Sequence, residues 1–264
     1  MSETSPAGST VRAFCVGQAK SGTASVCGLL ATHYRAAHEP ERAQVLDLIL
    51  REARGERDQD AVQVHLIDRD RRLNLEYDIA WANQFITSHF LAVFPHARFI
   101  VLVRDPYTWL QSIIGHLSSR QIPPEVRSFL DWWFKPERYP HTSDDRALEA
   151  CGVYSLGAFL NAWNQHVDSC ARALPPERRL VVRTHELNQS HARLAEFLQI
   201  PLKSLDAQGG HLNRSTWSGR LDSLVAGTYL NAMVGEVCGD NMGRYFPGVS
   251  GFEDVSRLWG APHG

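Results

Sequence analysis

The amino-acid sequence predicts an α/β fold, with a mainly parallel central sheet flanked by helices. Short apolar runs such as RFIVLV at 98–103 and RLVVRT at 179–184 have the length and composition of buried strands. Segments with apolar residues at helical spacing separate these runs, and strands that alternate with helices form parallel sheets. Ligands of such folds bind beyond the carboxyl ends of the strands, so we expect the chemistry in loops that follow strands.

The first half of the chain alternates predicted strands and helices. Helices are predicted where apolar residues recur every three or four positions, and strands where short apolar runs occur. The predicted elements are a strand at 11–16, helices at 22–37, 41–53 and 58–71, a strand at 73–77, a helix at about 79–94 and a strand at 98–103. The segment DPYTWLQSIIGHL begins the next helix, with Asp105 as the expected N-cap and Pro106 as its first residue.

The second half is mainly helical. The stretch 118–150 is rich in proline and holds five aromatic residues between Phe129 and Tyr139, which predicts either a lid or acceptor wall, or simply core. A long helix is predicted at 153–174 and a strand at 179–184, and helices are expected to fill most of the remainder.

Composition is that of a globular protein. Of the 264 residues, 44% are hydrophobic and 21% are charged, which excludes a disordered or fibrous chain. The 27 basic and 29 acidic residues give a formal net charge of -2, which argues against dedicated nucleic-acid binding. We expect a disordered tail at 1–10 and a single domain at 11–264.

Cysteine usage and the N-terminal segment predict a cytoplasmic location. The five cysteines form no CxxC pair, and an odd number in a long chain is typical of reduced thiols. The first residues lack the basic and apolar segments of a signal peptide, and no apolar stretch approaches the roughly 18 residues of a membrane-spanning helix. No membrane partner is therefore expected.

The loop GQAKSGTAS at 17–25 is the strongest candidate binding site. It lies between a predicted strand and a predicted helix, where free backbone amides, two glycines and Lys20 favour binding of a phosphate or sulfate group. Lys20 precedes Gly22, whereas the lysine of a nucleotidase P-loop follows the second glycine. An ordinary βα turn with a solvated lysine is the alternative interpretation.

A second candidate site is the segment RDPYTWLQS. Arg104 ends a predicted strand and Ser112 lies eight residues later, so a forked charged donor and a compact hydroxyl can converge on one phosphate monoester. An ion pair for Arg104 and a satisfied mid-helix hydroxyl for Ser112 are the alternatives.

These two motifs resemble those of the sulfotransferases that use 3'-phosphoadenosine 5'-phosphosulfate (PAPS), in particular the small cytosolic, bacterial-type members. AKSGTAS is similar to the family's 5'-phosphosulfate loop: Lys20, Ser21, Gly22 and Thr23 match, whereas Ala19 and Ala24 replace its usual proline and second threonine, and Ser25 follows. RDPYTWLQS is similar to the 3'-phosphate motif, whose arginine and serine correspond to Arg104 and Ser112.

The resemblance implies a P-loop-like three-layer fold and in-line transfer of a sulfuryl group from PAPS to a hydroxyl or amine of a small-molecule or carbohydrate acceptor, without a metal. Lys20 would stabilise charge on the leaving phosphate, and the amides of residues 21–25, with Ser21, Gly22, Thr23, Ala24 and Ser25, would hold the transferred group. The histidines show no HExxH spacing, so no metal site is expected. Arg214 in HLNRSTW is a candidate second phosphate contact, with a solvated loop arginine as the alternative.

The general base has three candidates. Glu76 and Asp78 are predicted at the carboxyl end of the strand at 73–77, and Glu76 with the following ANQF resembles the carboxylate version of the site in carbohydrate sulfotransferases. His89 in TSHFLAVFP resembles the histidine of phenol and steroid sulfotransferases, although it lies beside an apolar helical face. The sequence favours Glu76, with surface-helix capping or an ion pair to Arg71 or Arg72 as the alternatives.

Two other functions stay open at this point. One is an ATP-dependent small-molecule kinase with an atypical phosphate-binding loop, and the other is a nucleotide-binding relative that has lost turnover.

Overall fold

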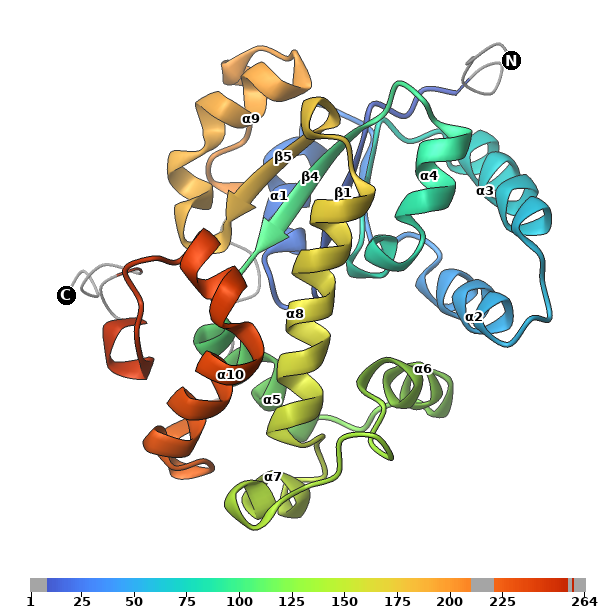
Figure 1. The fold of residues 1–264 in the computed structure, drawn as a ribbon. Coiled ribbons are helices and arrows are strands. Elements are labelled where there is room, and N and C mark those ends of the chain that lie inside the picture. The colour runs from blue at the N-terminus through green and yellow to red at the C-terminus, as the bar shows by residue number, and fades with distance from the viewer. Residues whose placement is uncertain (1–8, 210–220, 256–257, 259–264) are drawn as a thin grey trace. The chain divides into compact units, whose positions relative to one another are not determined.

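The structure is a computed structural model, which describes residues 9–209, 221–255 and 258 (Figure 1). The chain divides into two compact units. The first, the sheet unit, consists of residues 1–103 and 169–214, and the second, the helical unit, consists of residues 104–168 and 215–264. Residues 1–8 of the predicted tail lie outside the described residues.

The sheet unit contains five parallel strands in the order β2-β3-β1-β4-β5. This arrangement confirms the predicted α/β fold with a parallel sheet. The strands are β1 Ala13–Gly17, β2 Ala36–His38, β3 Tyr77–Ile79, β4 Arg98–Val103 and β5 Arg179–Arg183. The helices of this unit are α1 Thr23–Ala31, α2 Arg42–Ala53, α3 Gln59–Leu73, α4 Thr87–Val93 and α9 His191–Leu198.

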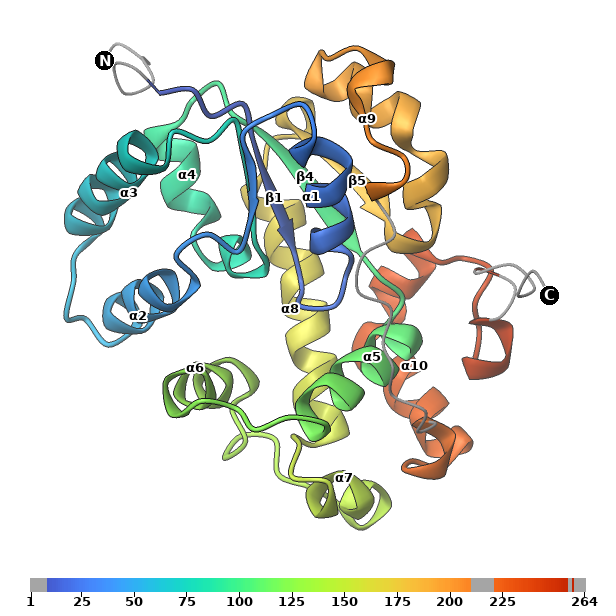
Figure 2. The same ribbon diagram turned by 180° about the vertical axis from the view of Figure 1, so that it is seen from behind.

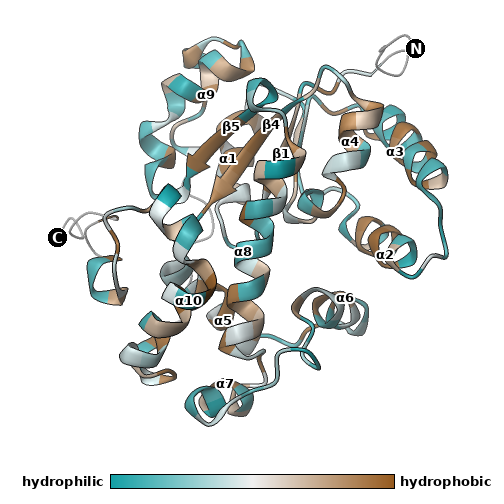
Figure 3. Ribbon diagram, viewed as in Figure 1, coloured by the Kyte–Doolittle hydropathy of each residue, from teal (hydrophilic) through white to brown (hydrophobic). Residues whose placement is uncertain are grey.

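Helices cover both faces of the sheet, as the opposite views of Figures 1 and 2 show. Ala13 and Cys15 of β1 belong to a buried cluster that includes side chains of α1 and α9. Phe14 points to the opposite face, where its ring stacks on Phe90 of α4 at 3.8 Å between centroids. Strands buried on both faces read as nearly continuous apolar runs, as β4 does in Figure 3.

The helical unit consists of helices around an aromatic core. Trp109 and Phe134 each pack edge-on against Phe159. Asp105 caps the first of these helices by accepting a hydrogen bond from the Thr108 amide at 2.8 Å, and Pro106 is its first residue, as predicted. The helices are α5 Pro106–Ser118, α6 Pro124–Phe134, α7 Arg146–Ala150, α10 Gly227–Tyr245 and the first part of α8 Leu156–Ala173, which continues into the sheet unit.

Short 3-10 helices connect these elements. They are η1 Trp81–Phe85, η2 Ser143–Asp145, η3 Pro176–Arg178, η4 Thr184–Gln189, η5 Leu202–Ser204, η7 Leu221–Ser223 and η8 Phe252–Asp254.

Three predicted elements differ from the structure. The helix at 22–37 ends at Ala31, and β2 follows, because three half-exposed residues at a sheet edge are too few to show a strand pattern. The strand predicted at 73–77 begins four residues later and ends two residues later, because Leu73 ends α3 and Asn74 takes the left-handed C-cap conformation. The helix at 79–94 is divided into η1 and α4.

The stretch predicted as a lid folds as α6, η2 and α7. Phe129, Trp133 and Phe134 are buried, and Trp132 and Tyr139 are half-buried. Most of the aromatic cluster is therefore core, and its role in acceptor binding stays a prediction.

Candidate functional site

The anion loop, residues 17–25, joins β1 to α1 as predicted. Two left-handed residues shape it, Lys20 with φ 72° and Gly22 with φ 104°. Both the amide and the hydroxyl of Ser21 donate to the Gln18 carbonyl, at 3.0 and 2.7 Å. The hydroxyl of Thr184, which follows β5, donates to the Ser21 carbonyl at 2.7 Å, so the loop is fixed from two sides.

The glycines of the loop are required by its geometry. A Cβ atom at Gly17 would lie 2.5 Å from Oγ of Ser21 and 2.9 Å from Cβ of Leu102, too close for any side chain. At Gly22 a side chain would force an L-residue into the left-handed region. Glycine at position 17 therefore permits the close approach of Ser21 and Leu102, and glycine at position 22 permits the left-handed turn into α1.

The amides at the start of α1 are available to an anion. No side chain caps the helix, and among the described residues no group accepts a hydrogen bond from the amides of Thr23, Ala24 and Ser25. The side-chain nitrogen of buried Gln18 likewise has no acceptor within the described part of the chain. Unpaired amides carry a partial positive charge, so this helix end can hold a phosphate or sulfate group.

Arg104 and Ser112 lie in the helical unit, Arg104 directly after β4 and Ser112 on α5. The Arg104 Nε donates to the hydroxyl of Thr108 at 2.9 Å, and burial lowers the pKa of Arg104. Thr108 and Ser112 are four residues apart on α5 and therefore share a face. The bond to Thr108 therefore holds the Arg104 side chain against the face of α5 that carries Ser112. Sequence reasoning missed Thr108 as a partner of Arg104.

Glu76 lies at the opposite end of its strand from the predicted one. It precedes the first residue of β3, and its carbonyl accepts hydrogen bonds from the amides of Arg12 and Ala13 at the start of β1. Its carboxylate forms ion pairs with Arg12 and Arg35, each at 3.7 Å. The expectation that Glu76 ends a strand beside the anion loop is therefore wrong, because the strand begins at Tyr77.

Asp78 and His89 are both buried and bonded to other side chains. Asp78, within β3, accepts hydrogen bonds from Arg69 at 2.5 Å and from Asn83 at 3.0 Å. The Nε2 atom of His89 lies 2.7 Å from a carboxylate oxygen of Glu52. A catalytic role for His89 stays a prediction, and Arg214 lies outside the described residues.

Sequence reasoning missed His38, the last residue of β2. Its Nε2 atom lies 3.0 Å from the hydroxyl of Thr23, the first residue of α1, and its side chain is 32% exposed. Burial lowers the pKa of His38, partly offset by the neighbouring Glu39 carboxylate. An accessible imidazole thus contacts the anion loop. Its place at a strand end was hidden because the predicted helix at 22–37 covered most of β2.

None of the helices in the described residues has the length and apolar character to span a membrane. These residues also contain no group of three or more histidine, cysteine or acidic side chains arranged to hold a metal ion.

Solved structures that are similar to this one include three sulfotransferases or sulfotransferase domains. The structure is similar to solved structures of a sulfotransferase from Alicyclobacillus acidocaldarius (17% identity, 94% of each chain covered, TM-score 0.47). It is also similar to the sulfotransferase domain of the curacin biosynthetic pathway (13% identity, 79% of this chain and 81% of that chain, TM-score 0.40). A third is the sulfotransferase domain of the Synechococcus PCC 7002 olefin synthase (12% identity, 98% of this chain and 97% of that chain, TM-score 0.40).

Curated protein sequences yield no match. The family model described as "Sulfotransferase domain" matches residues 12–206, more than half of the chain and all of the anion loop. The chain therefore belongs to the sulfotransferase domain family.

Proposed function

We propose that the protein transfers the sulfuryl group of PAPS to a hydroxyl or amine of a small-molecule or carbohydrate acceptor. The anion loop carries this proposal: the uncapped amides of α1 and the cation of Lys20 fit the 5'-phosphosulfate group. Arg104 and Ser112 would bind the 3'-phosphate that distinguishes PAPS from other adenine nucleotides. Arg214 stays a candidate second contact to it.

The reaction is an in-line displacement at sulfur. The acceptor oxygen or nitrogen forms a bond to sulfur while the bond between sulfur and the bridging oxygen breaks, and that electron pair stays on the 5'-phosphate of the product, 3'-phosphoadenosine 5'-phosphate (PAP). Lys20 would stabilise the charge that develops on the bridging oxygen. The proton of the acceptor must pass to a base.

His38 is the base that we propose in place of Glu76. Its contact with Thr23 puts the imidazole beside the residues that would hold the sulfuryl group. Burial lowers its pKa, which favours the neutral ring, and its side chain remains 32% exposed and so accessible to an acceptor. The Glu39 carboxylate lies 3.7 Å from Nε2 of His38 and also pairs with Arg42 at 3.1 Å. Its negative charge would stabilise the imidazolium that forms when the ring takes the proton.

Isothermal titration calorimetry with PAP, AMP and ATP tests the nucleotide assignment. We expect the protein to bind PAP without magnesium and more tightly than AMP, and Lys20→Ala to weaken PAP binding modestly. Lys203→Ala is the matched control, because Lys203 is an exposed lysine of the sheet unit outside the anion loop. Binding of ATP with magnesium in preference to PAP would instead support the kinase.

A further inference from the structure

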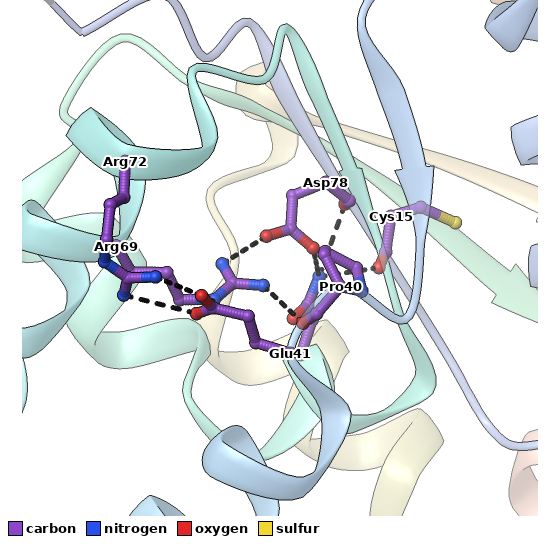
Figure 4. A network of polar contacts seen from close by, with 7 residues as sticks. Cys15, Pro40, Glu41, Arg69, Arg72 and Asp78 are labelled. Atoms are coloured by element: carbon purple, nitrogen blue, oxygen red, sulfur yellow. Dashed lines mark hydrogen bonds and ion pairs between the residues drawn. The ribbon is translucent and has the colours of Figure 1, made fainter.

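A buried network of charged side chains holds the segment that follows β2 (Figure 4). The guanidinium group of Arg69, on α3, donates to the Asp78 carboxylate at 2.5 Å and to the Pro40 carbonyl at 2.9 Å. Its Nε atom lies 3.5 Å from the Glu41 carboxylate, which Arg72 also binds. Arg69 thus joins β3 to two consecutive residues of the segment.

The segment has a backbone conformation that needs such support. Glu39 and Glu41, on either side of Pro40, both have positive φ angles, 52° and 53°. Left-handed conformations are unfavourable for residues other than glycine and persist where surrounding contacts impose them. Such strain is common beside functional sites.

The other side of the network is anchored in the sheet. Asn83 of η1 donates to the second oxygen of Asp78 at 3.0 Å and to the Cys15 carbonyl of β1 at 3.4 Å. Arg69 and Asp78 are nearly inaccessible to solvent, with side chains 5% and 3% exposed. A buried ion pair adds little net stability, because removing both charges from water costs about as much as their attraction gains. Stability alone therefore does not explain why Arg69 and Asp78 are paired here.

The network ends next to His38. The Glu39 amide, one residue after His38, donates to the Ile79 carbonyl at 2.8 Å, and His38 pairs with Ile79 across the two strands. The direction in which the chain leaves β2 therefore depends on the bonds to Pro40 and Glu41. The first residue of this segment also contacts the imidazole, since the Glu39 carboxylate lies 3.7 Å from Nε2 of His38.

We propose that Arg69 is a positioning residue for the proton acceptor: by holding Pro40 and Glu41 against Asp78, it keeps the His38 imidazole in contact with Thr23. The inference rests on the proposed function, because it assigns a purpose to the placement of His38. Asp78, which the sequence offered as a candidate base, instead holds Arg69 in place through their hydrogen bond.

Arg69→Lys is the direct test, because lysine keeps the charge but cannot bond Asp78, Pro40 and Glu41 together. Arg71→Lys is the matched control, since Arg71 lies two residues away on α3 and is exposed, paired only to Asp68 in the described contacts. The first readout is the NMR titration of His38, whose resonances are identified by their loss in His38→Asn. Glu39 and Arg42 are the charged groups that influence this titration.

We expect Arg69→Lys to raise the pKa of His38 toward the ordinary value of about 6.5, because a loosened segment exposes the ring, and Arg71→Lys to leave it unchanged. If Arg69→Lys does not fold, Glu41→Gln loosens the same segment from its more exposed side and should shift the titration in the same direction. An unchanged titration in the variant that folds would overturn the inference.

The second readout separates positioning from stability. Hydrolysis of PAPS to PAP and sulfate uses water as acceptor, so the natural acceptor need not be known. Arg69→Lys should lower its kcat about 10- to 100-fold in the wild-type background and change it within about twofold in the His38→Asn background. Equal losses in both backgrounds would overturn the inference. If wild-type protein neither binds PAP nor hydrolyses PAPS, the proposed function fails instead, and the titration still decides about Arg69.

Discussion

Glu76→Gln separates the two assignments of the base. Parallel pairing aligns Tyr77 with Ala13, so Glu76 lies beside the start of β1, whereas the anion loop follows the end of β1 at Gly17. Glu76 is level with Arg12, and the five residue steps of about 3.3 Å from Arg12 to Gly17 put it roughly 16 Å from the beginning of the loop. A general base must lie within about 3 Å of the proton that it takes. We therefore expect Glu76→Gln to retain turnover within about twofold.

The stability effect of Glu76→Gln should also be small. Its two partners, Arg12 and Arg35, have side chains 49% and 52% exposed, and ion pairs of this kind contribute about 0–1 kcal/mol. Glutamine can still accept the hydrogen bond that the Arg35 amide donates at 3.2 Å. Thermal unfolding should shift by no more than about 4 °C.

Steady-state PAPS turnover, PAP calorimetry and thermal unfolding of Glu76→Gln and His38→Asn form one assay set. His38→Asn should lower turnover about 10²- to 10⁴-fold with PAP binding intact. A loss of that size in Glu76→Gln, with PAP binding and unfolding unchanged, would refute the placement of the base at His38.

Four further predictions follow from the site. Lys20→Ala should lower turnover by roughly 10²- to 10³-fold and PAP affinity much less, because only the transition state has the added charge on the bridging oxygen. Equal losses of turnover and of PAP affinity, measured by kinetics and calorimetry, would contradict this role. Arg104→Ala should abolish the preference for PAP over AMP in calorimetry, since a charge-assisted bond contributes about 1.5–3 kcal/mol; a variant that still discriminates removes Arg104 from the site. Gly22→Ala should lower the free energy of unfolding by about 1–2 kcal/mol and weaken PAP binding. Gly55 is also left-handed, with nothing within 4 Å of the added carbon, so Gly55→Ala should lower stability only, and PAP titration of both variants distinguishes the two outcomes. Burial lowers the pKa of His38, and only the neutral ring accepts a proton, so kcat should fall as the pH drops through a value below about 6.5. If His38→Asn shows the same fall in kcat at low pH, the titrating group is another residue.

The anion loop was predictable because its chemistry is local. Glycine at positions 17 and 22, a lysine between them and the start of a helix follow one another in the sequence, and the structure places them as expected. The N-cap of α5 was predictable for the same reason, since Asp105 and Pro106 determine it without distant partners.

The base was not predictable from local pattern, because its position depends on strand boundaries. Leu73 and Leu75 look like strand residues, but Asn74 caps α3, and pairing with β1 begins only at Tyr77. That shift moved Glu76 to the wrong end of β3. His38 directly follows the helix predicted at 22–37, so no strand end was expected there. The role of Arg69 was equally hidden, since its partners at 40, 41 and 78 are brought together only by the tertiary fold.

Transfer of labelled sulfate is the most direct test of the central claim. Protein incubated with PAPS carrying ³⁵S in its sulfuryl group, and with a panel of phenols, sugars and amines, is analysed by chromatography and mass spectrometry. We predict that one acceptor class gains the label and the mass of SO₃ while PAP accumulates, and that Lys20→Ala forms far less product. Tight PAP binding with the label retained in PAPS, across the panel and in water, would contradict the proposed activity and favour a nucleotide-binding relative without turnover.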